Sequence, residues 1–198
     1  MKAFPRLLLI LGLFAVPALK ADTIADLTPK AEAGDLVSQV ELGNIYSKGE
    51  GVAKNEKEAV KWFSKAAEQG NLDAQMYLGG VYIRGKDIPK DSRESAKWYL
   101  MAAEQGNAAA QCQISRMHMM GAGVPKDDVE AYKWANLASA KGDMAAKKVL
   151  RILEKRMMPD QISLAQGLGR EFTELKKSDA PGGDAPPVEP IPPEVLEP

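Results

Sequence analysis

The stretch AEQGNLDAQMYLGGVY, residues 67–82, decides the fold because it recurs along the chain. Residues 31–46 read AEAGDLVSQVELGNIY, and residues 103–118 read AEQGNAAAQCQISRMH. A glycine marks the same point of each copy and recurs at a spacing of 36 residues, at Gly34, Gly70, Gly106 and Gly142. A fixed period of this length is typical of a solenoid built from stacked structural repeats.

Each copy predicts two helices. The first helix starts after the period glycine and carries small or apolar residues on one face at 3.6 residues per turn: Ala74, Leu78, Gly79 and Tyr82. The second helix carries a stripe with spacings of three and four residues, which predicts burial of Ser95, Trp98, Tyr99, Ala102 and Ala103. The chain between residues 31 and 150 is therefore predicted to consist of helices joined by short turns that contain glycine.

The second helix has recognisable ends in all copies. It opens with an N-cap type of residue, Asn55, Asp91 or Asp127, and three residues later stands Glu58, Glu94 or Glu130. This spacing predicts a capping box, in which the cap oxygen and the glutamate carboxylate each accept from a free backbone N–H. The period glycine is expected to end the helix with a positive φ, which costs glycine little.

The repeat resembles the Sel1-like repeat, a relative of the tetratricopeptide repeat. The matching residues of the middle copy are Gly70, Ala74, Gln75, Leu78, Gly79, Tyr82, Gly85, Ile88, Pro89, Ala96, Lys97, Trp98, Tyr99, Ala102 and Ala103. The resemblance implies an all-α fold, an α/α solenoid of helix-turn-helix repeats whose first helices line a concave side. It also implies binding of proteins rather than catalysis.

The repeats and their flanking segments give a predicted domain organisation. Repeats are expected at residues 31–66, 67–102 and 103–138, followed by a half repeat and a closing helix at 139–177. An N-terminal cap is expected at 22–30, with Thr28 as N-cap and Pro29 in the first helical turn. The closing helix is expected to begin at Pro159 and to fray at Gly167 and Gly169, because each glycine costs about 1 kcal/mol.

The two ends of the chain differ from the repeats. Residues 1–21, MKAFPRLLLILGLFAVPALKA, predict a secretory signal peptide cleaved after Ala18 or Ala21, and an uncleaved membrane anchor is the alternative. Residues 178–198 contain many prolines, five acids and no basic residue, which predicts a disordered acidic tail. A proline-rich ligand for a partner domain is the alternative for the tail.

Composition excludes several classes of function. The net charge of −1 and the absence of a basic run argue against nucleic acid as a partner. A single cysteine excludes an internal disulfide framework. The only histidine, His118, occupies the repeat slot of Tyr46 and Tyr82, and no nucleophile–base pair or phosphate loop appears. We therefore expect no catalytic residue and no cofactor.

One segment bears residues that suit a soft metal. Cys112, Met117, His118, Met119 and Met120 lie within nine residues, and thiol, thioether and imidazole groups are ligands for Cu(I). In the repeat register, however, these residues fall at the end of a first helix and point in several directions. The sequence therefore favours ordinary packing and keeps a periplasmic Cu(I)-binding protein as the alternative function.

The face of the first helix opposite its core positions shows no consensus between copies. In the first copy it carries Val37 and in the second Gly80. The candidates for binding a partner are Glu41, Asn44, Lys48, Asp73, Tyr77, Arg84, Gln113, Arg116 and Met120. Tyr77 and Arg116 are the strongest candidates, because tyrosine and arginine are enriched among residues that dominate interface energetics. This face is where we expect a protein partner.

Together these features predict an exported, non-catalytic interaction scaffold with a protein partner in its concave groove. The resemblance allows an envelope adaptor or an immunity protein that blocks a secreted, phospholipase-type toxin. No stable membrane insertion is expected once the signal peptide is removed. The sequence does not determine the partner or the oligomeric state.

Overall fold

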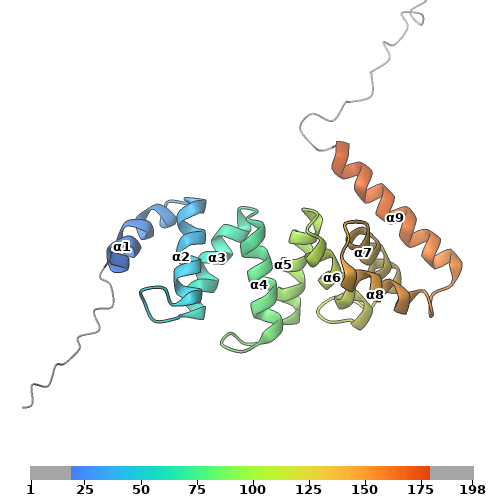
Figure 1. The fold of residues 1–198 in the computed structure, drawn as a ribbon, viewed down its shortest axis with the longest axis horizontal. Helices are drawn as coiled ribbons and strands as arrows, with labels where there is room; N and C mark the ends of the chain where they lie inside the picture. Colours follow the sequence, from blue (N-terminus) through green and yellow to red (C-terminus); the bar gives the residue numbers. More distant parts are fainter. Residues whose placement is uncertain (1–18, 179–198) are drawn as a thin grey trace, which may run out of the picture. The chain divides into compact units, whose positions relative to one another are not determined.

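A computed structural model describes residues 19–178, and every regular element in this range is a helix (Figure 1). The helices are α1 (Leu19–Glu32), α2 (Leu36–Lys48), α3 (Glu56–Glu68), α4 (Leu72–Arg84), α5 (Ser92–Glu104), α6 (Ala108–Met120), α7 (Asp128–Ala140), α8 (Met144–Leu153) and α9 (Pro159–Ser178). First helices of the repeat begin at residues 36, 72 and 108, and second helices at 56, 92 and 128. The predicted all-α fold and its 36-residue period are confirmed.

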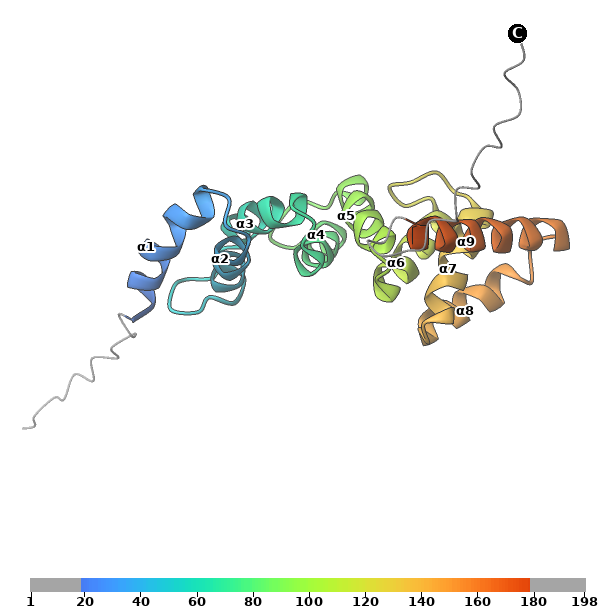
Figure 2. The ribbon, with the colours of Figure 1, turned by 90° about the horizontal axis from the view of Figure 1, so that it is seen from above.

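The chain forms two compact units, one ending at Asp91 and one beginning at Ser92. In the first unit α2 packs between α1 and α3, and α3 packs on α4. In the second unit α6 packs between α5 and α7, while α8 and α9 both pack on α7 (Figure 2). Each helix thus buries its apolar face against a neighbour within its own unit.

The buried stripe of the second helix is confirmed. Trp62, Trp98 and Trp134, one from each copy, are each 3% exposed. The small residues that follow them, Ala66, Ala67, Ala102, Ala103 and Ala138, are fully buried. On the first helix Ala74, Leu78 and Gly79 are buried and Tyr82 is half-buried. Small side chains at these positions let neighbouring helices approach closely.

A buried glutamine on each first helix bonds back to the preceding helix. The Nε2 atoms of Gln39, Gln75 and Gln111 donate to the carbonyl oxygens of Ala31, Ala67 and Ala103 at 2.9, 3.0 and 3.1 Å. Each of these carbonyls also accepts from the N–H of the period glycine, at 2.9 to 3.2 Å, so the glutamine is a second donor that ties the first helix to the end of the helix before it. The sequence pattern placed Gln75 among the repeat residues but did not predict this role.

The structure confirms the N-cap part of the predicted capping box at α3 and α7, but not the glutamate part at α7. Asn55 and Asp127 accept from two backbone N–H groups each, at 2.8 to 3.2 Å, at the starts of α3 and α7. Glu130 does not complete a capping box, because its carboxylate instead accepts from Lys133 and Trp134. Glu58 lies 3.5 Å from the Lys61 ammonium group. The reciprocal half of the box was therefore wrong at α7.

The prediction that Thr28 is a helix N-cap was wrong. Helix α1 begins at Leu19, so Thr28 and Pro29 lie inside it rather than at its start. The Thr28 hydroxyl donates to the carbonyl of Ile24 at 2.7 Å, a bond that a threonine within a helix can form. Three residues of the predicted signal peptide, Leu19 to Ala21, belong to this helix, and residues 1–18 lie outside the described range.

The closing helix begins at Pro159 as predicted, but the expected fraying is not seen. Helix α9 continues to Ser178, and Gly169 is buried where α9 meets Lys133 and Leu137 of α7. Packing on α7 stabilises the segment that its own propensity weakens. Of the predicted tail, residues 179–198 lie outside the described range. None of the described helices is long and apolar enough to cross a bilayer.

The glutamine bond generates a stability prediction. Replacing Gln39 with Met keeps the side-chain length but removes the donor to the Ala31 carbonyl and the acceptor for Gln69. We expect a loss of about 1–3 kcal/mol in the free energy of unfolding, because two hydrogen bonds worth about 0.5–1.5 kcal/mol each are removed. Urea unfolding followed by circular dichroism measures it. The control Gln113→Met, on a half-buried position, should change the value by only about 0.5 kcal/mol; equal losses would contradict the assignment.

The glycines of α9 generate a second prediction. A Cβ at Gly167 or Gly169 would meet its nearest atom at 3.9 Å, an ordinary contact. Alanine at either position should therefore raise the free energy of unfolding by about 1 kcal/mol through helix propensity. Gly123→Ala is the opposing control, because φ is +78° and the new methyl would overlap the Ser92 carbonyl. A lower urea midpoint for both α9 variants would show that the glycines are needed for packing.

Candidate protein-binding face

The nine residues predicted to contact a partner lie on α2, α4 and α6, and we call them the outward face. Glu41, Lys48, Asp73, Arg84, Arg116 and Met120 are exposed, whereas Asn44, Tyr77 and Gln113 are half-buried. Gly80, which the helical pattern placed on the same side, is buried. The outward face is therefore narrower than the sequence predicted.

In the first unit the outward face adjoins a hollow of about 720 Å³ between α1 and α2. Its lining includes Leu27 and Lys30 of α1 together with Val37 and Glu41 of α2. Val37 is 71% exposed and places an apolar side chain in the lining of the hollow. The hollow thus presents apolar surface beside groups of both charges. This is the composition of a contact surface rather than of a catalytic pocket.

Tyr77 is already engaged within the first unit. Its hydroxyl donates to Glu56 Oε1 at 2.6 Å, and its ring centroid lies 4.3 Å from that of Phe63. Both contacts join α4 to α3. The side chain predicted to be a strong anchor for a partner therefore also holds two helices together.

Electrostatics around Tyr77 follow from this contact. Burial and the hydrogen bond to Glu56 raise the pKa of Tyr77 well above its usual 10. Burial also acts to raise the pKa of Glu56, but the Tyr77 hydroxyl and the Lys54 ammonium group outweigh it and hold that pKa below 4.5. Near neutral pH Glu56 is therefore ionised and Tyr77 protonated. Neither has the pKa near neutrality that suits a general acid or base.

In the second unit the outward face carries an arginine and a methionine on α6. Met120 is 58% exposed, and Arg116 forms no ion pair with any residue in the described part of the chain. Ile152 of α8, which packs on α6, is 50% exposed and was not predicted. It occupies the repeat position of Arg116 one period later, so extending the register through the half repeat would have found it.

The residues considered for a soft metal lie in different environments. Cys112 is buried against Ala138 and Ala146, and burial followed by the nearby Asp143 charge raises its pKa to about 11. Met119 packs against the core of α7, α8 and α9, whereas Met120 is exposed. A buried, protonated thiol is a poor metal ligand. Among the described residues no group of three His, Cys, Asp or Glu side chains could hold a metal ion.

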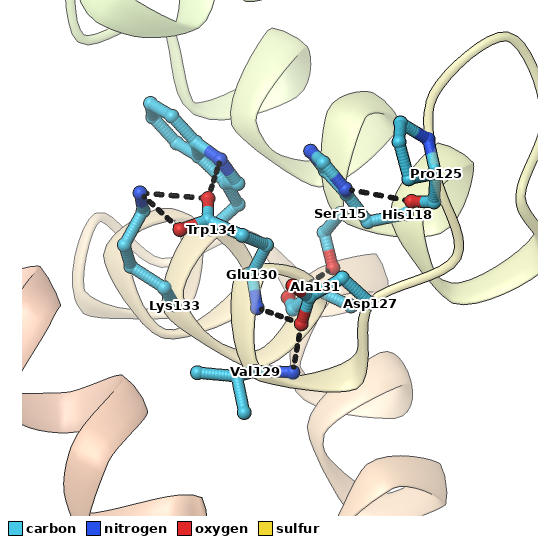
Figure 3. A network of polar contacts seen from close by, with 9 residues as sticks. All are labelled: Ser115, His118, Pro125, Asp127, Val129, Glu130, Ala131, Lys133 and Trp134. Atoms are coloured by element: carbon cyan, nitrogen blue, oxygen red, sulfur yellow. Dashed lines mark hydrogen bonds and ion pairs between the residues drawn. The ribbon is translucent and has the colours of Figure 1, made fainter.

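Figure 3 shows the polar contacts around His118 and the start of α7. His118 Nδ1 lies 3.2 Å from the Pro125 carbonyl oxygen, and the Ser115 hydroxyl donates to the Ala131 carbonyl at 2.6 Å. The Glu130 carboxylate lies between the Lys133 ammonium group and the Trp134 indole nitrogen, at 2.7 and 3.1 Å (Figure 3). The Ser115 contact joins α6 to α7, and the His118 contact joins α6 to the turn that follows it, which gives the histidine a structural role.

Solved structures similar to this chain are repeat proteins. A Sel1 repeat protein from Oxalobacter formigenes is 40% identical with a TM-score of 0.57, over 65% of this chain and 97% of that protein. Cysteine-rich protein B of Helicobacter pylori shares the fold at 23% identity and a TM-score of 0.50, over 70% and 99% of the two chains.

A protective antigen of uropathogenic Escherichia coli, c5321, with an SLR fold, is 30% identical with a TM-score of 0.47. That match covers 78% of this chain and 41% of the antigen. No curated protein matches the sequence.

The sequence model of the Sel1 repeat matches residues 36–71, 72–107 and 108–143, more than half of the chain. These units start at the first residues of α2, α4 and α6. The repeats expected at 31, 67 and 103 have the same period and differ only in where the unit is cut. The chain belongs to the Sel1 repeat family.

Proposed function

We propose that this protein is a non-catalytic scaffold that binds a protein partner through its outward face. Sel1 repeat proteins generally serve as protein–protein interaction scaffolds, and the family is typically non-catalytic. The observation that carries the proposal is the exposure of Arg116, Met120 and Ile152 on two helices of the second unit that pack on each other. The Arg116 guanidinium forms no ion pair within residues 19–178, and Met120 and Ile152 are 58% and 50% exposed.

This group has the composition of an interface centre. Arginine is enriched among residues that dominate binding energy, and it pairs with carboxylates through two parallel hydrogen bonds. Methionine is flexible and adapts its shape to a partner. Burial of Met120 and Ile152 would contribute the apolar part of the binding energy. The partner we expect therefore presents a carboxylate flanked by apolar side chains.

The outward-face residues of the first unit are mostly charged. Glu41 and Asp73 are exposed together with Lys48 and Arg84, so both signs are represented. Exposed charges change encounter rates and discriminate between partners more than they add to affinity. We assign these residues to partner selection and place most of the binding energy in the second unit.

We also propose that the protein is exported. Helix α1 starts at Leu19, so cleavage of the N-terminal segment after Ala18 would leave the helix whole, whereas cleavage after Ala21 would remove its first three residues. In the periplasm or outside the cell the partner would be an envelope protein or a secreted toxin. In the second case the protein would act as an immunity protein that covers the toxin.

The test is a cross-linking pull-down with mass spectrometry from the native host, with the bait recovered from the envelope fraction and its N-terminal residue sequenced. A triple variant, Arg116→Ala, Met120→Ala and Ile152→Ala, should recover the partner at least about tenfold less, because truncation of central residues costs about 2 kcal/mol or more. The matched control is Lys147→Ala, Lys148→Ala and Glu171→Ala, which changes exposed residues elsewhere in the same unit.

Each outcome bears on one part of the proposal. Recovery by the control but not by the triple variant, with equal helicity in circular dichroism, supports the outward face. Equal recovery by both variants would move the site elsewhere. A bait that keeps its N-terminal segment and stays in the cytosol would contradict export without affecting the site.

A variant of Tyr77 distinguishes a role in folding from a role in binding. Tyr77→Phe removes the hydrogen bond to Glu56 and should lower the free energy of unfolding at pH 7 by about 1–2 kcal/mol. Because the pKa of Glu56 is lowered in the folded state, its stabilising effect is present above pH 4.5 and is lost as the pH falls through the folded pKa. Urea unfolding at pH 7 and at decreasing pH should show the two proteins converge.

The comparison variant is Tyr132→Phe, whose hydroxyl lies 3.4 Å from Glu154 Oε1 and should lose less. Partner recovery should be unchanged by Tyr77→Phe. A loss of recovery without a loss of stability would return Tyr77 to the binding surface.

A further inference from the structure

The second unit contains a hollow of about 410 Å³ bounded by the turn between α5 and α6, the end of α7 and the second half of α9. Leu137 of α7 and Phe172 of α9 form its apolar wall. None of the outward-face residues described in this unit lines it. The hollow is therefore a feature separate from the proposed partner face, and we call it the Gln111 hollow.

Gln111 brings an unpaired buried atom to this hollow. Its side chain is 1% exposed, and its Nε2 donates to the Ala103 carbonyl at 3.1 Å. Its Oε1 accepts from no residue in the described part of the chain. Buried acceptors are nearly always paired, and leaving one unpaired is costly. A donor supplied from outside the described residues would satisfy it.

The first repeat shows which donor is missing. There the Oε1 of Gln39 accepts from Gln69 Nε2 at 2.8 Å, and the same Nε2 also reaches the Gly34 carbonyl at 3.1 Å. The residue equivalent to Gln69 for Gln111 is Lys141. The Lys141 ammonium group bonds to the equivalent carbonyl, that of Gly106, but does not reach Gln111. Replacement of glutamine by lysine at this position has left the oxygen without its donor.

Charge adds a second requirement on the occupant. Lys141, Lys176 and Lys177 line the hollow together with one acid, Glu104. Lys176 Nζ lies 5.9 Å from the Phe172 ring, so a cation flanks the apolar wall. A fitting ligand therefore carries carboxylates for the lysines, an N–H for Gln111 and an apolar side chain for Leu137 and Phe172. An extended acidic peptide has all three.

This chain supplies such a peptide directly after α9. Residues 179–198 contain five acids and no basic residue, and they follow the turn of α9 that carries Lys176 and Lys177. We infer that the Gln111 hollow is a peptide-binding site and that its occupant is the acidic segment of residues 184–191 of the same chain. Covalent attachment keeps the segment at a high effective concentration, so modest contacts suffice.

The sequence of the segment fits the site. Residues 179–183 link Ser178, the last residue of α9, to the segment. Asp184 and Glu189 then supply carboxylates, and Val188 supplies both an N–H and an apolar side chain. The neighbouring prolines lack an N–H and favour an extended backbone, which lowers the entropy lost on binding.

Paramagnetic relaxation in the ¹⁵N-labelled chain tests the inference. A spin label is attached through Val195→Cys in a Cys112→Ala background, so that only one thiol reacts. Amide signals of Gly106, Lys141 and Thr173 should lose intensity, while those of α8 should keep it. No loss at the hollow would overturn the proposal.

Lys141→Gln is the decisive variant, because it restores the residue that pairs with the glutamine oxygen in the first repeat. It should lower the bound-to-free ratio of the segment about tenfold, since a buried hydrogen bond to the segment is replaced by an internal one. Lys147→Gln on α8 makes the same charge change at an exposed position and should have no effect. An unfolding midpoint at or above that of the parent shows that Lys141→Gln is folded.

Two further experiments test the acidic residues of the segment and distinguish binding within one chain from binding between two copies. Asp184→Asn with Glu189→Gln should release the segment as Lys141→Gln does, and unchanged broadening in either variant would contradict the assignment. In a mixture of spin-labelled ¹⁴N chain and unlabelled ¹⁵N chain, the amide signals should keep their intensity. Broadening in that mixture would assign the site to the segment of a second copy instead.

Discussion

The hydrogen bond from a buried glutamine to the end of the preceding helix is the constraint on which the repeat depends. The helix before each first helix ends in a tight turn, in which the N–H of the period glycine bonds to a carbonyl three residues earlier. Gln39, Gln75 and Gln111 reach back eight residues and donate to that same carbonyl. The bond fixes how each first helix sits on the helix before it. Close packing of alanines that are fully buried follows from that fixed approach.

Because buried residues hold the repeat together, the residues of the outward face can differ between copies. Residues that hold the repeat, such as Leu78 and Trp98, are buried and recur in kind, whereas Arg116 and Met120 are exposed and have different counterparts in the other copies. A stable scaffold with a variable face suits recognition of a partner protein. Tyr77 is an exception, because it lies on the outward face but its hydroxyl joins α4 to α3.

The substitution of one repeat residue can create a site without changing the fold. Gln69 serves both the Gly34 carbonyl and Gln39, whereas Lys141 serves the Gly106 carbonyl alone. Lys141 keeps the hydrogen bond to the carbonyl of the turn but does not donate to the side-chain oxygen of Gln111. The freed acceptor, the added charge and the aromatic ring of Phe172 then meet in one hollow. Repeat proteins can acquire binding sites in this way at positions that look like scaffold.

The sequence by itself determined the helices, their 36-residue period and the buried stripe of the second helix, because these depend on residues three and four apart and on glycines that end helices. It misjudged the start of α1 and the behaviour of Gly169, because packing on a neighbouring helix outweighs local propensity. Only the tertiary structure decided that Tyr77 bonds to Glu56 and that no residue between 19 and 178 donates to the side-chain oxygen of Gln111. Each of these depends on which side chain a different helix presents, and periodicity within one helix carries no information about that.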